Sequence, residues 1–280
     1  MATGLLFMTQ KETKNTTEDF NKLSIQVGLN GLSFCVQDTV NQEVLAYERV
    51  PIKVHSTPYL LLKELKTILN TKKIESARFA EVLVVHRNGL FSLVPKSLFQ
   101  TEELPNYLKF NAKIMANDQI AYDVLDDHEM VNVYIPFTNV NNYIFELFGE
   151  FEFKHSGTVL IHTLLEHNRA SQDTFCYVQV MEKEMELVVI SQKKLLLYNY
   201  FEFKNDEDTL YYILFVLEQL NIPAESVLLR LFGNVEEGDA LFKRCQEFVK
   251  NVSIFVPTNS ADFAEDFSTQ SIDLTVFNNQ

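Results

Sequence analysis

The sequence has few cysteines and no tryptophan. The three cysteines, Cys35, Cys176 and Cys245, each stand alone inside an apolar segment. That spacing excludes a zinc site built on paired cysteines, and it excludes a disulfide framework. We therefore expect reduced, buried thiols in a cytoplasmic protein. The aromatic part of the core is expected to come from the 23 phenylalanines and 11 tyrosines.

Long apolar runs are also missing. No stretch approaches the roughly 20 residues that a membrane-spanning helix needs, so we expect no membrane insertion. The opening Leu5-Leu6-Phe7-Met8 is too short for the core of a signal peptide, and no basic residue precedes it. The residues that follow it are polar, and 1–19 is predicted to form a flexible leader.

Positive charge is in deficit, with 24 Lys and Arg against 38 Asp and Glu, which gives a net charge of −14. Nucleic acids and anionic membranes require clustered Lys and Arg, so we expect no nucleic-acid partner. The same deficit argues against a triphosphate site, although a local field can oppose the global one. A hydrophobic content of 46% with 22% charged residues is ordinary for a globular protein.

The first half of the chain has the pattern of three strands, a helix and a fourth strand. Leu23, Ile25 and Val27 alternate onto one face, as in a half-buried strand. A capping hydroxyl followed by Pro58 predicts the start of the helix. The predicted elements are strands at 23–28, 32–37 and 43–50, a helix from Ser56-Thr57-Pro58 with Leu61, Leu65, Ile68 and Leu69 on one stripe, and a strand at 81–86.

The second half repeats this order. The first two strands are predicted to enclose a charged turn, Glu182-Lys183-Glu184. The predicted elements are strands at 175–181, 186–191 and 194–203, a helix capped within 205–208, a strand at 226–232, a helix over 241–249 and a strand at 252–256. Matching order in both halves predicts a duplicated α/β fold with two lobes and a ligand cleft between them.

The halves differ by about 50 extra residues after the fourth strand of the first half. This segment contains a turn signal, Asn88-Gly89, and the alternating run 130–135. We interpret it as a small inserted subdomain. The predicted organisation is a leader at 1–19, a first lobe at 20–171 with the insertion at about 87–137, a second lobe at 172–257 and a C-terminal tail at 258–280.

This duplicated element order resembles the actin-like ATPase fold, a ribonuclease H-like duplication with mixed five-stranded sheets. The fold is shared by actin, sugar kinases, Hsp70-type chaperones and bacterial pilus or divisome assembly proteins. The resemblance covers roughly 22–257. Within this superfamily the chain resembles an uncharacterised bacterial family with no established activity. The insertion is similar to the extra subdomain of the pilus and divisome branch.

The resemblance implies nucleotide motifs, and the chain departs from them. The first hairpin of the superfamily reads Asp-x-Gly, with the Asp serving Mg²⁺; here the matching residues are Gln26-Val27-Gly28. A neutral amide thus replaces the anionic oxygen that Mg²⁺ prefers. The second hairpin, from Tyr177 to Lys183, offers no glycine and no acid at the matching point. The adenosine motif is reduced to Phe232-Gly233-Asn234.

The candidate ligand-binding residues are Gly28, Asn30, Gly31, Gly233 and Asn234. The first three could form an amide nest for an anion. The alternative is a plain hairpin turn in which Asn and Gly supply positive φ angles. Gly233 and Asn234 could contact an adenine, or they could simply form a turn. We assign no catalytic residue and no metal ligand, and ATP with Mg²⁺ is a disfavoured cofactor.

Two groups superficially resemble metal sites. His162 and His167 lie about 140° apart around a helix at 100° per residue, so they cannot share one metal. The acidic cluster Asp123, Asp126, Asp127, His128 and Glu129 lacks the glycine-centred loop of calcium sites. We expect a solvated acidic turn there.

The leading hypothesis is a non-catalytic binding or scaffold protein that retains the actin-like architecture and acts through contacts with a protein partner. The alternative is a nucleotide- or small-molecule-binding protein, or an ATPase, that uses the cleft between the lobes.

Overall fold

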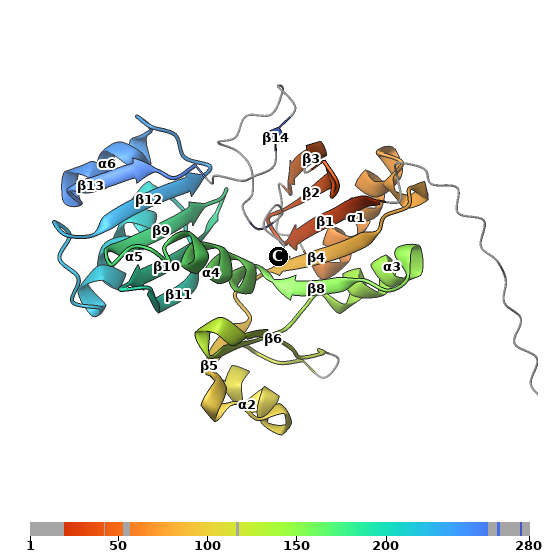
Figure 1. Cartoon of the computed structure of the whole chain (residues 1–280), viewed down its shortest axis with the longest axis horizontal. Coiled ribbons are helices and arrows are strands. Elements are labelled where there is room, and N and C mark those ends of the chain that lie inside the picture. The colour runs from red at the N-terminus through yellow and green to blue at the C-terminus, as the bar shows by residue number, and fades with distance from the viewer. Residues whose placement is uncertain are drawn as a thin grey trace, which may run out of the picture.

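The computed structural model describes residues 20–41, 43–52, 57–115, 118–256, 262–263 and 275. Two large sheets form two lobes, a smaller sheet lies beside them, and helix α4 (Ser156–His167) lies where the three parts meet (Figure 1). The predicted leader at 1–19 falls outside the described residues. The predicted α/β class with an actin-like duplication is confirmed.

The first lobe is built on a sheet of order β14-β3-β2-β1-β4-β8. Its strands are β1 (Asn21–Gly28), β2 (Gly31–Asp38), β3 (Glu43–Pro51), β4 (Glu81–Arg87), β8 (Glu152–His155) and β14 (Asp262–Phe263). The pairs β1–β2 and β2–β3 are antiparallel, while β4 runs parallel to both β1 and β8. The sheet therefore has five main strands, as expected, plus the short β14 from the segment predicted to be a tail.

Helices α1 (Pro58–Thr71) and α3 (Thr138–Phe148) cover the core of the first lobe. The predicted stripe is confirmed, because Leu61, Leu65 and Leu69 are fully buried against the sheet. The predicted helix start is also confirmed: the Thr57 side chain accepts a hydrogen bond from the backbone N–H of Leu60. Capping of this kind satisfies one of the free N–H groups at a helix start.

The second lobe repeats the arrangement on a sheet of order β11-β10-β9-β12-β13. Its elements are β9 (Thr174–Val180), β10 (Glu184–Ser191), β11 (Lys194–Glu202), α5 (Asp206–Gln219), β12 (Leu228–Gly233), α6 (Ala240–Phe248) and β13 (Asn251–Ile254). Asn205 caps α5 by accepting from the N–H of Asp208. The two antiparallel pairs and the parallel β9–β12 pair match those of the first lobe, so the duplication predicted from the pattern is present in the topology.

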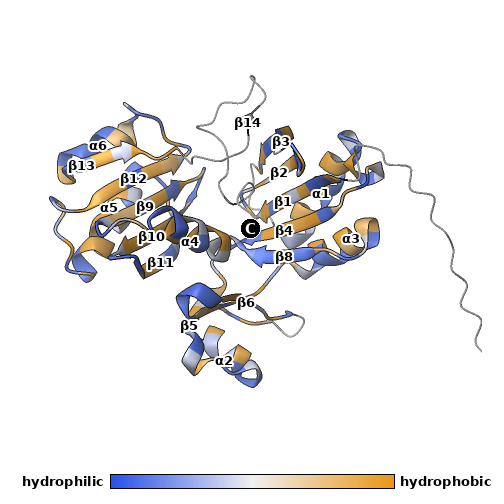
Figure 2. Cartoon of the chain, viewed as in Figure 1, coloured by the Kyte–Doolittle hydropathy of each residue, from blue (hydrophilic) through white to orange (hydrophobic). Residues whose placement is uncertain are grey.

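The insertion forms a third sheet between β4 and α3. Its elements are β5 (Phe91–Pro95), α2 (Leu104–Leu108), β6 (Ala121–Leu125) and β7 (Met130–Tyr134), in the sheet order β5-β7-β6. This insertion subdomain has its own apolar core around Leu108, Val131 and Val133. Hydrophobic residues dominate the strands of the two lobes, whereas β8 at the sheet edge is largely hydrophilic (Figure 2).

Helix α4 joins the parts. Its residues from Ser156 to Ile161 are all buried, and Leu160, Ile161, Leu164 and Leu165 share one cluster with residues of the insertion subdomain and of the second sheet. The helix approaches β11 so closely that a Cβ on Gly157 would lie 2.3 Å from the Tyr198 ring. His155 caps the helix through its Nδ1, which accepts from the Gly157 N–H. Among the described residues no helix is long and apolar enough to span a membrane.

Candidate functional site

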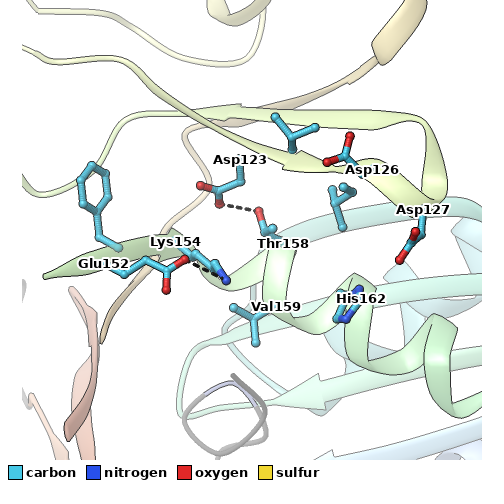
Figure 3. A pocket seen from close by; sticks show the side chains of 11 residues that line it. Asp123, Asp126, Asp127, Glu152, Lys154, Thr158, Val159 and His162 are labelled. Carbon is cyan, nitrogen blue, oxygen red and sulfur yellow. Dashed lines mark hydrogen bonds and ion pairs between the residues drawn. The ribbon is translucent and has the colours of Figure 1, made fainter. Parts of the chain in front are cut away.

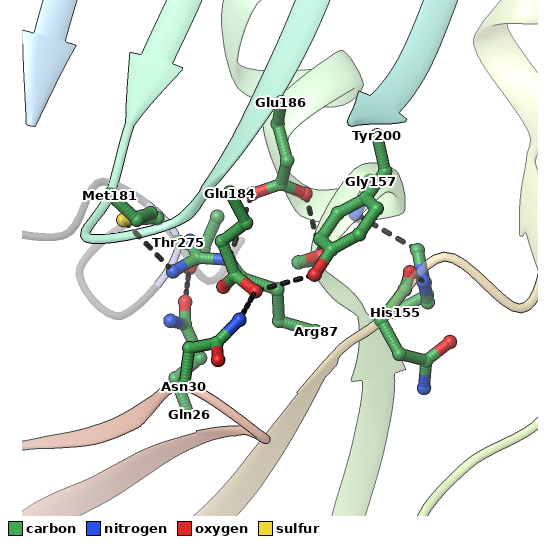
Figure 4. Close-up of polar contacts among 12 residues, drawn as sticks. Gln26, Asn30, Arg87, His155, Gly157, Met181, Glu184, Glu186, Tyr200 and Thr275 are labelled. Carbon is green, nitrogen blue, oxygen red and sulfur yellow. Dashed lines mark hydrogen bonds and ion pairs between the residues drawn. The ribbon is translucent and has the colours of Figure 1, made fainter. Parts of the chain in front are cut away.

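The turn of the β1–β2 hairpin meets the start of β10 where the two lobes join. The Asn30 side chain donates from Nδ2 to Glu184 Oε2 at 2.6 Å. The Tyr200 hydroxyl donates to the same carboxylate at 2.5 Å (Figure 4). Asn30, predicted to bind a ligand, is therefore used to hold one lobe against the other.

A buried ion pair lies beside this contact. Arg87, the last residue of β4, donates from Nε to Glu186 Oε2 at 2.9 Å, and the two side chains are only 4% and 1% exposed. The other carboxylate oxygen of Glu186 accepts from Ser156 Oγ and from the Tyr198 hydroxyl, both at 2.7 Å. A buried charge is tolerable only when it is paired and hydrogen-bonded, and Glu186 meets both conditions.

Glu184 and Glu186 point to the same face of β10 because side chains two apart in a strand share a face. Burial raises the pKa of the Glu184 carboxyl above its ordinary value, while Arg87 and the hydrogen bonds from Tyr200 and Asn30 act in the opposite direction. The guanidinium of Arg87 also contacts Met181 Sδ at 3.4 Å. Arg87 therefore stabilises the charged forms of two carboxylates of the opposite lobe, Glu184 and Glu186.

Arg49 of β3 makes a second set of contacts between the lobes, nearer the surface. It donates to Glu182 at 3.0 Å and to the Asn234 side chain at 2.5 Å. The amide oxygen of Asn234 is therefore engaged by the first lobe, and the backbone N–H of Asn234 donates to Val180 O at 2.7 Å. Two polar groups of this predicted binding residue, its side-chain oxygen and its backbone N–H, are thus bonded within the protein.

Gly233 ends β12 with a φ of +91°, and a Cβ there would lie 2.3 Å from the carbonyl oxygen of Val180. Only glycine fits this close approach in the left-handed region. The backbone geometry therefore requires a glycine at 233 independently of any ligand. A role in binding adenine stays a prediction.

Gly28 and Gly31 pair directly across the hairpin, with Leu29 and Asn30 forming its two-residue turn. Neither Asn30 nor Gly31 has a positive φ, so the expectation that these residues supply one is wrong. A Cβ on Gly31 would lie 3.2 Å from Val50 O on the neighbouring strand, so this glycine instead allows β2 to lie close to β3. Anion binding by the hairpin amides stays a prediction.

Gln26 stands where the actin-like fold is expected to place its magnesium-binding acid. Its side chain is 3% exposed, and its Oε1 accepts a hydrogen bond from the hydroxyl of Thr275. Mg²⁺ prefers hard anionic oxygens. The nearby carboxylates, Glu184 and Glu186, are already shared with Arg87 and other donors. The residues at this junction therefore do not fit a magnesium–triphosphate group.

The pattern alone did not identify Arg87, Glu184 and Glu186 as interface residues. Glu184 was predicted to belong to a charged turn, which is wrong: it begins β10 and is buried. The signal in the sequence is the period-two spacing of Glu184 and Glu186 at the start of an otherwise apolar strand. Their partner Arg87 is 99 positions from Glu186, so only the folded chain shows the pair.

A separate cavity of about 440 Å³ lies between β6, β8 and α4 (Figure 3). Its charged and polar lining residues are Asp123, Asp126, Asp127, Glu152, Lys154, Thr158 and His162. Asp126 and Asp127 are exposed, as expected for a solvated turn. The expectation is wrong for Asp123, which lies on β6 and points inward.

Asp123 is held by three donors: the Tyr134 hydroxyl at 2.9 Å, the His155 N–H at 2.8 Å and Thr158 Oγ1 at 2.7 Å. Burial raises the pKa of its carboxyl to about 6, against the opposing effect of these hydrogen bonds and of Lys154. The group ties the insertion subdomain to β8 and α4. Within the described ranges no group of three or more His, Cys, Asp or Glu residues could hold a metal ion.

The two lobes, each with three antiparallel strands, a crossover helix and a further parallel strand, define an actin-like ATPase fold. A Bacteroides thetaiotaomicron protein with an actin-like ATPase fold and unknown function is similar, with a TM-score of 0.78 and 22% identity over 89% of this chain and 96% of that one. PilM from the PilM–PilN type IV pilus biogenesis complex has a TM-score of 0.63 at 13% identity, over 91% and 96% of the two chains. No curated protein matches the sequence.

A family model described as "Protein of unknown function (DUF3822)" matches residues 10–252. The chain therefore belongs to the DUF3822 family, which agrees with the resemblance to an uncharacterised family seen in the sequence.

Replacing Arg87 by Met should leave Glu186 buried without its cation. Breaking a buried pair on one side typically lowers the free energy of unfolding by about 3–5 kcal/mol. The control is Arg169→Met, which removes an exposed pair with Glu166 and should change stability by no more than about 1 kcal/mol. Denaturant unfolding of both variants measures the difference, and equal small effects would contradict a structural role for the buried pair.

Asp123→Asn should change how stability depends on pH. Because the folded pKa of Asp123 is raised, its contribution is fully present below the ordinary value of 3.8 and is lost as pH rises through about 6. The melting temperature of the native protein should therefore fall relative to that of Asp123→Asn between pH 4 and pH 6. The exposed Asp127→Asn is the control; a difference between the native protein and Asp123→Asn that does not vary with pH would refute the expectation.

Proposed function

We propose that this DUF3822 protein is a non-catalytic binding protein, a scaffold that acts through contacts with another protein. The observation that carries the proposal is the direct contact between the lobes through Asn30–Glu184 and Arg87–Glu186. In an actin-like ATPase the equivalent loops are expected to hold the phosphates and a magnesium ion. Here their polar groups are occupied by one another.

The Asp123 cavity offers a place for the partner. β6 and β8 are each the last strand of their sheets among the described residues, and both line the cavity. Unpaired strand edges present free N–H and C=O groups that an extended peptide can pair with. Such a peptide would add a strand to the edge of β6, because the His155 N–H of β8 is already donated to Asp123, and its side chains would enter the cavity.

The charge of the cavity indicates the kind of peptide. Asp126, Asp127 and Glu152 face solvent around it, although Asp126 is paired with Lys96 and Glu152 with Lys154, the latter at 3.1 Å. The balance is negative, so a segment with Lys or Arg is favoured. The similarity to PilM, a protein whose structure is of a complex with PilN, supports a protein-binding role for this fold.

Titration with Mg·ATP tests the non-catalytic part of the proposal. A ligand at 100 times its Kd stabilises a protein by about 2.7 kcal/mol. We expect no rise in melting temperature at millimolar Mg·ATP, because Gln26 stands where the magnesium-binding acid is expected and the junction carboxylates Glu184 and Glu186 are bonded to Asn30 and Arg87. A clear upward shift would favour the alternative, a nucleotide-binding protein that uses the junction between the lobes.

Affinity capture tests the binding part. The tagged full chain is compared with an Asp126→Lys/Asp127→Lys variant, using extracts of cells that express the protein. A partner that docks at the Asp123 cavity should be retained by the native chain and lost with the variant. Glu236→Lys/Glu237→Lys makes the same charge change at exposed residues of the second lobe and should retain it. If both variants capture what the native chain captures, the cavity is not the binding site.

A further inference from the structure

Two described parts of the C-terminal segment lie against the first lobe. β14 pairs in parallel with β3, with Asp262 opposite Glu43 and Phe263 opposite Val44. Thr275, further along the chain, is fully buried and donates its hydroxyl to Gln26. The segment predicted to be a tail thus contributes a strand to the sheet and a buried contact at its centre.

The face of the sheet that Thr275 covers follows from the strand period. Ile25 and Val27 of β1 pack into the core formed with α1 and α3. Gln26 lies between them and so points to the opposite face. The residue beside Gln26 on the parallel strand is Val85, which packs against Val159 of α4. Thr275 therefore sits on the side of the sheet that faces α4 and the second lobe.

The groups around Thr275 are those that join the lobes. Figure 4 shows the Thr275–Gln26 hydrogen bond beside Arg87, Asn30 and Met181. A neutral amide at position 26 suits this contact, because a hydroxyl can satisfy its oxygen without burying a charge. An aspartate at this position would instead place an ionised group in a buried site. Glutamine at position 26, where the fold is expected to place an acid, therefore suits a buried contact with the Thr275 hydroxyl.

We propose that Thr275 is an intramolecular ligand of the junction between the lobes. Its hydroxyl is bonded to Gln26, and β14, the other described part of the C-terminal stretch, pairs with β3 at the edge of the first sheet. Any other ligand that reaches Gln26 has to displace Thr275. The inference does not depend on a partner at the Asp123 cavity, because that cavity lies beside β8, at the other edge of the sheet from β14.

Thiol labelling of the full chain tests whether Thr275 is held against Gln26. Thr275→Cys keeps a small side chain with a weak donor, and its labelling rate in the native protein reports how often position 275 becomes accessible. Val256→Cys, at an exposed residue, is the comparison. The three natural cysteines are buried, and burial raises the pKa of each thiol, so they should react slowly.

We expect the thiol of Thr275→Cys to be labelled at least about tenfold more slowly than that of Val256→Cys, a ratio that corresponds to about 1.4 kcal/mol. Adding Gln26→Leu to Thr275→Cys should raise the rate toward that of Val256→Cys, with an unchanged melting transition showing that the lobes remain folded. Equal rates at the two positions would overturn the proposal. If labelling of Thr275→Cys stays slow when Gln26→Leu is added, Gln26 is not what holds Thr275, and that part of the proposal is wrong.

Hydrogen exchange of the unsubstituted chain tests the contact between Thr275 and Gln26 without introducing a cysteine. The peptide that contains Thr275 should exchange more slowly than the peptide that contains Val256, and Thr275→Val should remove that protection while Thr275→Ser keeps it. Absence of protection at Thr275 in the native chain would also overturn the proposal.

Discussion

The buried ion pair between Arg87 and Glu186 sets how the two lobes meet. Taking two charges out of water costs several kcal/mol per ion, so the pair persists only because Ser156 and Tyr198 donate to the remaining carboxylate oxygen. Arg87 ends β4 of the first lobe, and Glu186 lies within the second sheet. Their geometry brings Asn30 to Glu184, and it places Arg49 within reach of the second lobe. The lobes therefore join through complementary charges on the chain itself.

This arrangement changes what the actin-like fold can do here. An ATPase of the fold needs anionic oxygens free to hold magnesium and loop amides free to hold phosphates. In this chain Glu186 is paired with Arg87, Glu184 accepts from Asn30, and Gln26, at the position expected for the magnesium-binding acid, accepts from Thr275. A scaffold needs only the fixed relation of the lobes and an accessible surface. The acidic cavity between β6, β8 and α4 is the surface that we propose for this role, with the edge of β6 beside it.

Local patterns in the sequence predict most of the fold, because alternation at Leu23, Ile25 and Val27 and the helical stripe through Leu61 report burial directly. The site is harder to predict. The sequence pattern places Glu184 in a charged turn and Glu186 at the start of a strand, and it does not show that Glu186 pairs with Arg87, 99 positions away. Asp123 belongs to an acidic cluster, and the sequence does not distinguish it, the member that points inward, from its exposed neighbours. The pattern Asn30-Gly31 in the first hairpin predicts positive φ angles, whereas the constraint on Gly31 is the close approach of β2 to β3.

The central claim is that the lobes are fixed to each other and do not open for a nucleotide. The most direct measurement is the distance between spin labels on introduced cysteines at Glu64 of α1 and Glu218 of α5, both exposed, in the full chain with and without millimolar Mg·ATP. The account predicts a single narrow distance distribution that Mg·ATP leaves unchanged. A second distance, or a shift on adding Mg·ATP, would contradict it.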